Sequence, residues 1–298
     1  MEAGKKRKLF LAAFIGLVVL AVSITVAVLV AGPRDSVVEL VSSSGSELVV
    51  NDLYQGNMTI PKFAAPINTY NPEQFVERRG VVTYEGGTSL VGINVNAQKG
   101  DIDWDAVAAG GVDYVMIRVG HRMYKTGKIV LDENFEKNIK GALDAGLQVG
   151  VYFYSKAITE TEAEEEASFV LEQIRGYTVT FPVAFYWEYD LADDGSRDLD
   201  SRTVKCNGDQ VTDFTDAFCK KVKAAGFTPC YYCDKTMGYE GLNLTKLASY
   251  EMWYAEFRAV PSFYYAFGMW QYTKEGEVPG FADGVKVPIS LAFKEYGK

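Results

Sequence analysis

The sequence predicts an α/β fold in which strands and helices alternate and close into a barrel, preceded by one hydrophobic segment. Three observations lead to this prediction. An uncharged apolar run occupies residues 9–31. From about Val91 onward, apolar strands alternate with amphipathic helices, which is the pattern of parallel β-α units. The number of such units over roughly 200 residues favours a closed barrel, with sites at the carboxyl ends of its strands.

The N-terminal apolar run has the length of a transmembrane helix, which needs about 20 residues. It is longer than the apolar part of a secretory signal peptide, which favours an anchor that is not removed. The basic residues Lys5, Lys6, Arg7 and Lys8 precede it and should remain in the cytoplasm. We therefore expect a cytoplasmic tail (residues 1–8), a transmembrane helix (9–31) and an extracellular remainder, in a single-pass protein of the cell membrane.

Residues 32–90 are expected to be an extracellular stalk and arm. The stalk is predicted over residues 32–60, with the polar run at 42–46 as its most flexible part. The prolines and glycines between Ile60 and Leu90 predict an extended arm against the domain, with a hairpin around residues 80–84.

The barrel is expected over residues 91–298. Strands are predicted at 112–118, 148–154, 181–188, 229–233, 251–255 and 268–272, and helices at 132–145, 159–175 and 210–225. In the second helix Thr159 and Glu162 have the spacing of a capping box. Gly146, Gly176 and Gly226 follow the three helices, as glycine does at helix ends.

Composition and rare residues limit the function classes. A net charge of −9 argues against nucleic acid as a partner, because phosphate binding needs a basic face. The four cysteines, Cys206, Cys219, Cys230 and Cys233, allow three disulfide pairings, but their spacing does not fit a zinc ribbon. The only histidine, His121, is predicted in a surface loop. We expect no metal and no cofactor.

Several phrases resemble one enzyme family in the order in which they occur. These include GINVNAQKGDIDW at 92–104, VDYVMIRVG at 112–120, FPVAFYWEY at 181–189 and MWQYTKEGEVPG at 269–280. Together they resemble the family-25 glycoside hydrolases, the lysozyme-like muramidases. The resemblance implies an irregular TIM-like (β/α) barrel with eight strands and fewer than eight helices. It also implies a cleft for the N-acetylmuramic acid–N-acetylglucosamine backbone of peptidoglycan.

The resemblance also implies a set of acidic residues at the mouth of the barrel, most of which this chain replaces. Asn94 stands at the aspartate of the opening strand, and Tyr186 at the aspartate of an Asp-x-Glu pair whose glutamate is Glu188. In the family's C-terminal Val-Asp-x-Asn motif, Lys286 falls at the aspartate and Pro288 at the asparagine. Glu188 is then the only retained family acid.

These replacements affect the chemistry. Glycoside hydrolysis needs a proton donor and a second carboxylate. Asn94 carries no charge, and a tyrosine such as Tyr186 is neutral at working pH. A cation at Lys286 would lower the pKa of Glu188, which is unfavourable for a general acid. Asp101, Asp103 and Asp190 could in principle supply a substitute acid. However, Asp101 and Asp103 are expected to begin a helix, and Asp190 is expected to lie in a loop.

Other residues of the implied cleft lie at or near predicted strand ends, where aromatic faces could pack on sugar rings. These candidate substrate-binding residues are Arg118, Tyr152, Tyr154, Tyr232, Trp253, Trp270 and Gln271. The same side chains could instead fill the barrel core or its rim. Trp187 is predicted to be a core residue.

Three functions remain open. The favoured one is a membrane-anchored pseudoenzyme that binds peptidoglycan or a related cell-wall glycan without cutting it. The second is an active muramidase that hydrolyses the N-acetylmuramic acid–N-acetylglucosamine β-1,4 bond in cell-wall turnover, with Glu188 as acid. The third is a protein-interaction module with a reassigned cleft.

Overall fold

The computed structural model describes residues 36–78 and 80–297. The predicted cytoplasmic tail and transmembrane helix lie outside these residues. Within them, no helix combines the length and the apolar character that crossing a membrane requires. Residues 36–298 cluster as one compact unit.

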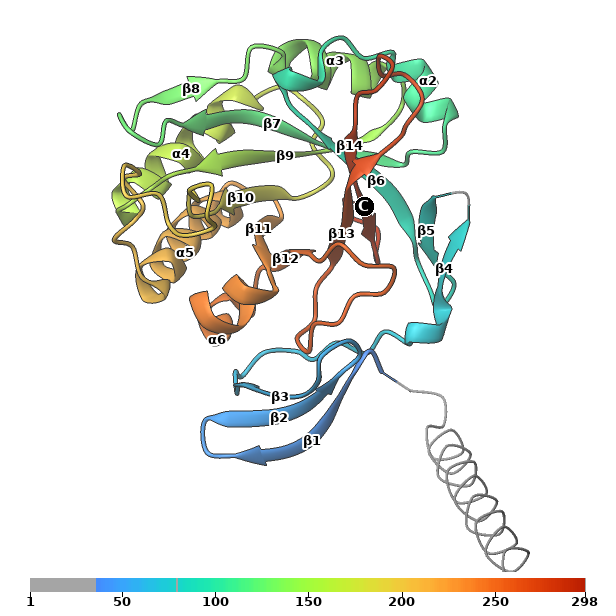
Figure 1. Cartoon of the computed structure of the whole chain (residues 1–298). Coiled ribbons are helices and arrows are strands. Elements are labelled where there is room, and N and C mark those ends of the chain that lie inside the picture. The colour runs from blue at the N-terminus through green and yellow to red at the C-terminus, as the bar shows by residue number, and fades with distance from the viewer. Residues whose placement is uncertain (1–35, 79, 298) are drawn as a thin grey trace, which may run out of the picture. The chain divides into compact units, whose positions relative to one another are not determined.

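Eight strands of the described chain close into a barrel (Figure 1). Closure follows from β6, which pairs with β14 on one side and with β7 on the other. The strands are β6 (Leu90–Val95), β7 (Tyr114–Arg122), β9 (Gln148–Ser155), β10 (Val183–Trp187), β11 (Pro229–Asp234), β12 (Glu251–Ala255), β13 (Met269–Gly276) and β14 (Val287–Ala292). A short strand, β8 (Ile129–Leu131), pairs with β7 outside the closed ring.

The barrel departs from regular β/α alternation in its last third. Neighbouring strands from β6 to β13 are parallel, but β14 runs antiparallel to both β13 and β6. The described α-helices are α2 (Trp104–Ala109), α3 (Phe135–Asp144), α4 (Glu160–Gln173), α5 (Gly208–Ala224) and α6 (Leu244–Leu247). Because no α-helix separates β12 from β13 or β13 from β14, the predicted shortage of helices is confirmed there.

Local sequence explains the helix boundaries well. Thr159 caps α4 by accepting a hydrogen bond from the backbone N–H of Glu162 at 3.2 Å. The Glu162 carboxylate accepts from the N–H of Ile158 at 2.9 Å rather than from Thr159, so only one half of the predicted capping box forms. Glycines at 146, 176 and 226 have positive φ, the conformation in which glycine ends a helix without strain.

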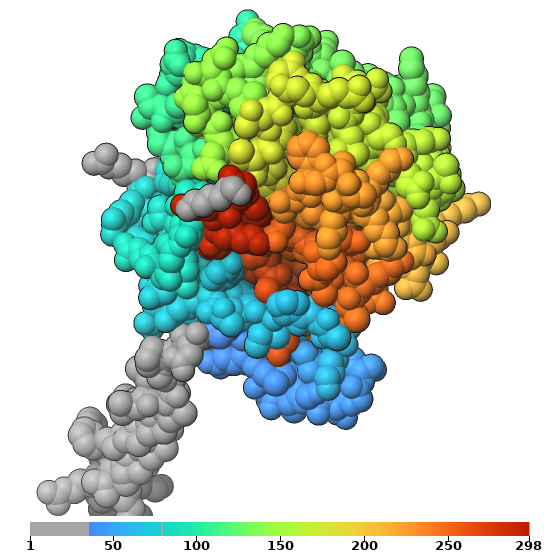
Figure 2. Space-filling model, turned by 180° about the vertical axis from the view of Figure 1, so that it is seen from behind, coloured from blue at the N-terminus to red at the C-terminus, as the bar shows by residue number. Residues whose placement is uncertain are grey.

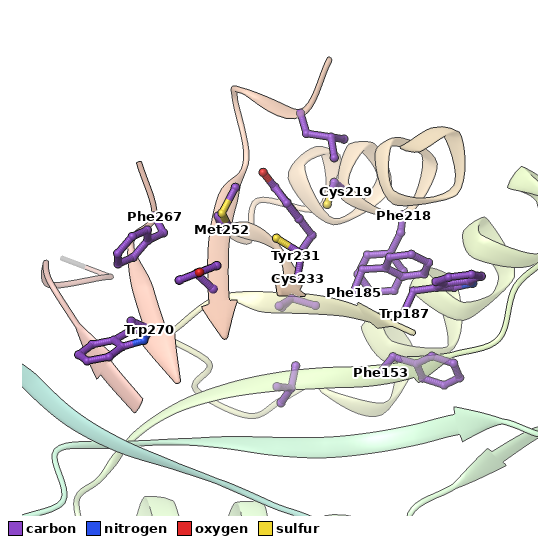
Figure 3. Close-up of a cluster of buried hydrophobic side chains, with 14 of the residues drawn as sticks. Phe153, Phe185, Trp187, Phe218, Cys219, Tyr231, Cys233, Met252, Phe267 and Trp270 are labelled. Carbon is purple, nitrogen blue, oxygen red and sulfur yellow. The ribbon is translucent and has the colours of Figure 1, made fainter. Parts of the chain in front are cut away.

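Alternate residues of each barrel strand face two different cores. On β10, Ala184 and Tyr186 point into the barrel, whereas Phe185 and Trp187 point outward beneath the helices. Figure 3 shows the outer set, with Phe185 beside Phe218 of α5 at a ring separation of 5.0 Å. The indole N–H of Trp187 donates to the carbonyl of Ala157 at 2.9 Å, which confirms Trp187 as a core residue.

A three-stranded antiparallel sheet occupies the segment predicted to be a flexible stalk. Its strands are β1 (Val38–Ser44), β2 (Glu47–Asp52) and β3 (Gly56–Pro61). The physical reason is the alternation along β2, which buries Leu48 and Val50. Figure 2 shows this sheet in blue, adjoining the cyan arm.

Ion pairs fix the sheet to loops at the carboxyl ends of β11 and β12. The buried Asp52 carboxylate lies 2.7 Å from the ammonium of Lys235, which is also 3.3 Å from Glu256. The Lys235 ammonium donates to the hydroxyl of Ser262 at 2.6 Å. The N-terminal sheet is therefore an integral part of the folded unit.

The predicted hairpin of the arm is present as β4 (Phe75–Arg78) and β5 (Val81–Tyr84). It lies on the outer wall of the barrel, where Phe75 packs edge-on against Trp270 at 5.4 Å. The backbone N–H of Val82 donates to the Tyr272 hydroxyl at 3.3 Å.

Candidate active site

The carboxyl ends of β10 and β11 form one wall of a cleft of about 690 Å³. Glu188 follows β10 directly and is half-buried. Tyr232 and Asp234 come from β11, and Lys274 comes from the outer part of β13. A π-helical turn, η3 (Met237–Gly241), also lines the cleft.

Burial raises the pKa of the Glu188 carboxyl above its ordinary value of 4.5. The cations Lys274 and Lys156 oppose this increase, and the negative charge of Asp234 adds to it. The predicted lowering of the Glu188 pKa by Lys286 is therefore not found. Burial has the largest effect on this pKa, and the lysines that oppose it are Lys274 and Lys156. A raised pKa is the property that a general acid needs at neutral pH.

Tyr186 occupies the space beside Glu188. Its hydroxyl donates to Oε1 of Glu188 at 3.3 Å, and its ring stacks on that of Tyr232 at 3.8 Å. Burial raises the pKa of Tyr186 well above 10, so the phenol is neutral, as expected from the sequence. Tyr154 packs edge-on against the same ring at 5.4 Å.

Asn94 is joined to Tyr232 through Gln271 inside the barrel. The Tyr232 hydroxyl donates to Oε1 of Gln271 at 3.1 Å, and Nε2 of Gln271 donates to Oδ1 of Asn94 at 2.8 Å. Both Asn94 and Gln271 are buried. This neutral chain of hydrogen bonds gives partners to the side-chain oxygens of Gln271 and Asn94 without a carboxylate.

Lys286 lies apart from this group. Its ammonium pairs with Glu277, and Lys286 is not among the charges that shift the pKa of Glu188. The register of β14 places Pro288, rather than Lys286, level with Asn94, because Ile289 pairs with Ile93. Neither Pro288 nor Lys286 carries a carboxylate.

The other predicted cleft residues lie in three different places. Tyr152, Tyr232 and Trp253 converge inside the barrel, with ring separations of 5.2 to 6.0 Å around Trp253. Burial raises the pKa of Tyr152 to about 12. Arg118 lies further along the rim and pairs with the buried Asp132 at 2.8 Å. Trp270 is not brought to the cleft, because its side chain points to the outer wall and donates to the carbonyl of Glu256 at 3.0 Å (Figure 3).

Two of the aspartates considered as substitutes are engaged elsewhere. Asp103 caps α2 by accepting from the N–H of Ala106 at 3.0 Å, and Asp101 pairs with Lys137 on the surface. Asp190 lies 2.8 Å from the ammonium of Lys156, which also donates to the carbonyl of Glu188 at 2.6 Å.

Asp234 is a carboxylate of the cleft that sequence reasoning missed. Tyr186 pairs in register with Tyr232, so Glu188 and Asp234, each two residues further, extend from the same faces of neighbouring strands. One Asp234 oxygen accepts from the N–H of Met237 at 2.8 Å. The sequence does contain a signal for Asp234, because this residue directly follows the strand predicted at 229–233. The family pattern, however, indicated only the acid at the end of β10.

His121 and the four cysteines are the other residue types that could bind a metal. His121 lies in β7 rather than in a surface loop, and its buried Nδ1 has no hydrogen-bond partner. Burial and the nearby Arg118 lower the pKa of His121. The four cysteines are buried free thiols. Among the described residues, no group of three or more His, Cys, Asp or Glu side chains could hold a metal ion.

Comparison with known proteins identifies the family. Residues 93–281 match the model for glycosyl hydrolases family 25. The autolytic lysozyme of Clostridium acetobutylicum is 25% identical over 194 residues, which are 65% of this chain and 53% of that protein. The chain thus spans about half the length of this curated relative.

Solved structures share the fold. The modular autolysin LytC of Streptococcus pneumoniae superposes with a TM-score of 0.57 at 21% identity, over 84% of this chain and 57% of that one. A family 25 glycosyl hydrolase of Bacillus anthracis has a TM-score of 0.55 at 16% identity, over 69% and 89% of the two chains. Since the family match covers more than half of the sequence, the chain belongs to glycosyl hydrolases family 25.

Proposed function

We propose that the barrel is a peptidoglycan-binding, lysozyme-like domain in which the family's hydrolytic chemistry is impaired or lost. The observation that carries the proposal is that uncharged, hydrogen-bonded side chains occupy two of the family's acidic positions. The hydroxyl of Tyr186 contacts Glu188, and Asn94 accepts from Gln271, so neither family position supplies a carboxylate. Loss of the second carboxylate removes the nucleophile or base that the reaction needs.

The glycan as ligand is inferred from the relatives. One relative is an autolytic lysozyme, and LytC has been solved in complex with a synthetic peptidoglycan ligand. The aromatic residues of the cleft support the same ligand class, because Tyr189 and Tyr232 line it.

We further propose that residues 9–31 anchor the protein in the cell membrane, with the barrel outside the cell. The basic cluster before this apolar run supports that orientation. Cleavage of the barrel by a protease added to intact cells, with a cytoplasmic marker left intact, would support the orientation. Survival of the barrel until the cells are lysed would contradict it.

A second candidate is an active muramidase, and one observation favours it. The raised pKa of Glu188 suits a proton donor, and Asp234 supplies a carboxylate on the neighbouring strand. In this case Glu188 would protonate the leaving glycosidic oxygen as its bond to the anomeric carbon breaks. The Asp234 carboxylate would bond to that carbon, and a water molecule deprotonated by Glu188 would then release the sugar.

The two candidates are separated by measuring binding and cleavage with the full-length chain in detergent micelles. Purified peptidoglycan is used to follow co-sedimentation and loss of turbidity. The first proposal predicts co-sedimentation without turbidity loss above that of Glu188→Gln. Turbidity loss that disappears in both Glu188→Gln and Asp234→Asn, but not in the surface control Glu172→Gln, would overturn it in favour of the muramidase. If the chain neither binds nor cleaves peptidoglycan, the result would instead favour a protein-interaction module.

A further inference from the structure

A second hollow of about 570 Å³ lies beside the cleft, between the β4–β5 hairpin and the outer end of β13. The hairpin contributes Glu77 and residues 80–82 to its wall. The barrel contributes residues 257–259 after β12, Lys286, and residues 272, 273 and 275–277 of β13 and the following loop. We call this hollow the arm groove. Its hairpin wall lies outside the family-matched residues 93–281, so the family barrel alone does not build it.

The arm groove adjoins the Glu188 cleft through one pair of side chains. Phe257 lines the groove and is 48% exposed. The Lys274 ammonium, which lines the cleft, lies 4.8 Å from the centre of the Phe257 ring. A ligand in the cleft could therefore extend a branch past Phe257 into the groove.

The barrel wall of the groove presents a strand edge. Pairing between β12 and β13 ends at Ala255 and Gln271, although β13 continues to Gly276. The residues of β13 beyond Gln271 therefore have no β12 partner for their backbone groups. An exposed strand edge of this kind binds extended peptides through main-chain hydrogen bonds.

The groove also carries charges of both signs that form no ion pair within the part of the chain that the structure describes. Arg258 lies over the Tyr54 ring at 5.1 Å, and no carboxylate of residues 36–78 or 80–297 forms an ion pair with it. Glu77 on the hairpin and Glu275 on β13 likewise make no ion pair within the described chain. A ligand that bears both a carboxylate and an ammonium group would complement this arrangement.

We propose that the arm groove binds the short peptide that branches from the peptidoglycan glycan. This peptide carries free carboxylates and an amine, is covalently joined to the sugar backbone, and is short enough to lie along one strand edge. The proposal rests on the proposed function, because the glycan must occupy the neighbouring cleft. A peptide site here would give a function to the β4–β5 hairpin, which packs against β13 beside the cleft.

The test measures how the peptide changes the affinity of the full-length chain for soluble glycan. Peptidoglycan fragments that retain their peptides are compared with the same fragments after an amidase has removed them. We expect peptide removal to weaken binding by about tenfold, as for loss of a few charged contacts. Arg258→Glu and Glu77→Lys should each weaken binding to the intact fragments and leave binding to the stripped glycan within about twofold.

Matched charge reversals control for the overall charge. Arg175→Glu and Glu172→Lys lie on the exposed surface at the end of α4 and should leave both affinities unchanged. Thermal midpoints of all variants establish that they are folded. Equal affinity for intact and stripped fragments would overturn the groove proposal and leave the proposed function standing. Equal weakening for both ligands in Arg258→Glu would instead identify a glycan site. Binding of neither fragment by the unmodified chain would refute the proposed function itself.

Discussion

The ring of Tyr186 lies flat against that of Tyr232, with centroids 3.8 Å apart and 19° between the ring planes. By its resemblance to the family pattern, Tyr186 falls at an aspartate position, and its hydroxyl donates to Glu188. Because the position holds a packed aromatic side chain, introducing an aspartate there would remove a stacked ring as well as add a carboxylate.

Removing the Tyr186 hydroxyl should raise the pKa of Glu188. The hydrogen bond from this hydroxyl stabilises the ionised carboxylate and so lowers the pKa of Glu188. In Tyr186→Phe the ring stack is retained and only the donor is lost. Nuclear magnetic resonance titration of ¹³C-labelled glutamate would measure the change, with Tyr154→Phe as control. A pKa that is unchanged or lower would show that the hydrogen bond does not act on Glu188.

Replacing Glu188 by glutamine should stabilise the protein at neutral pH. The folded pKa of Glu188 is raised above the ordinary value of 4.5, so folding favours the protonated form. The stability from this group is fully present below the unfolded pKa and is lost as pH rises through the folded pKa. Glu188→Gln should therefore unfold at higher urea than the unmodified protein at pH 7, with a smaller difference at pH 4. Equal midpoints at both pH values would contradict the raised pKa, and Glu172→Gln is the exposed control.

Reintroducing the family acids should distinguish Pro288 from Lys286 as the third replaced position. The starting variant is Asn94→Asp with Tyr186→Asp, to which either Pro288→Asp or Lys286→Asp is added. We expect muramidase activity only with Pro288→Asp, because Pro288 is level with Asn94 in the register of β14. Turbidity loss of purified peptidoglycan measures the outcome.

These variants need a stability check first. Loss of the Tyr186 ring should cost about 3–5 kcal/mol, as for other buried aromatic truncations. Urea unfolding identifies the variants that remain folded at the assay temperature. Activity with Lys286→Asp but not with Pro288→Asp would refute the register assignment. Inactivity of both folded variants would refute the idea of a disarmed family site.

Loss of the Lys235 ammonium should loosen the N-terminal sheet. Lys235 pairs with the buried Asp52 carboxylate and with Glu256, and Lys235→Met leaves both acids without their cation. Breaking a buried pair from one side typically costs about 3–5 kcal/mol. Hydrogen exchange should show faster exchange in β1–β3, while the barrel strands change little.

The control is Lys140→Met, which removes an exposed pair with Glu136 on α3 and should leave the exchange rates of β1–β3 unchanged, because exposed ion pairs contribute little to stability. Unchanged exchange in β1–β3 of Lys235→Met would mean that apolar packing, not the ion pairs, holds the sheet.

Residue patterns within the barrel were sufficient to predict most of its elements. The apolar stretches at 148–154 and 251–255 and the helix at 159–175 are found with shifts of a few residues at most. The reason is local: strand and helix periodicities and glycine stops are properties of neighbouring residues. The stalk prediction failed because the burial of Leu48 and Val50 depends on partners that are distant in the sequence.

Within the candidate site, the ordered phrases drew Asn94, Tyr186 and Glu188 from the sequence, and the structure places Glu188 in the cleft with the Tyr186 hydroxyl beside it. Asp234 was not selected, because its proximity to Glu188 follows from the pairing of β10 with β11. Trp270 was misplaced for a related reason. Its position near a strand end was correct, but the face of the strand on which it lies depends on the register of β13 with β12.

By itself, the sequence determined the alternating α/β pattern, the family resemblance and the uncharged side chains at positions 94 and 186, because each depends on residue identity and local order. Only the tertiary structure decided that β14 closes the barrel antiparallel and that Pro288 rather than Lys286 is level with Asn94. It also decided that burial raises the pKa of Glu188 and that the N-terminal sheet and arm are built onto the barrel. These features arise from strand register and desolvation, which bring together residues far apart in the chain.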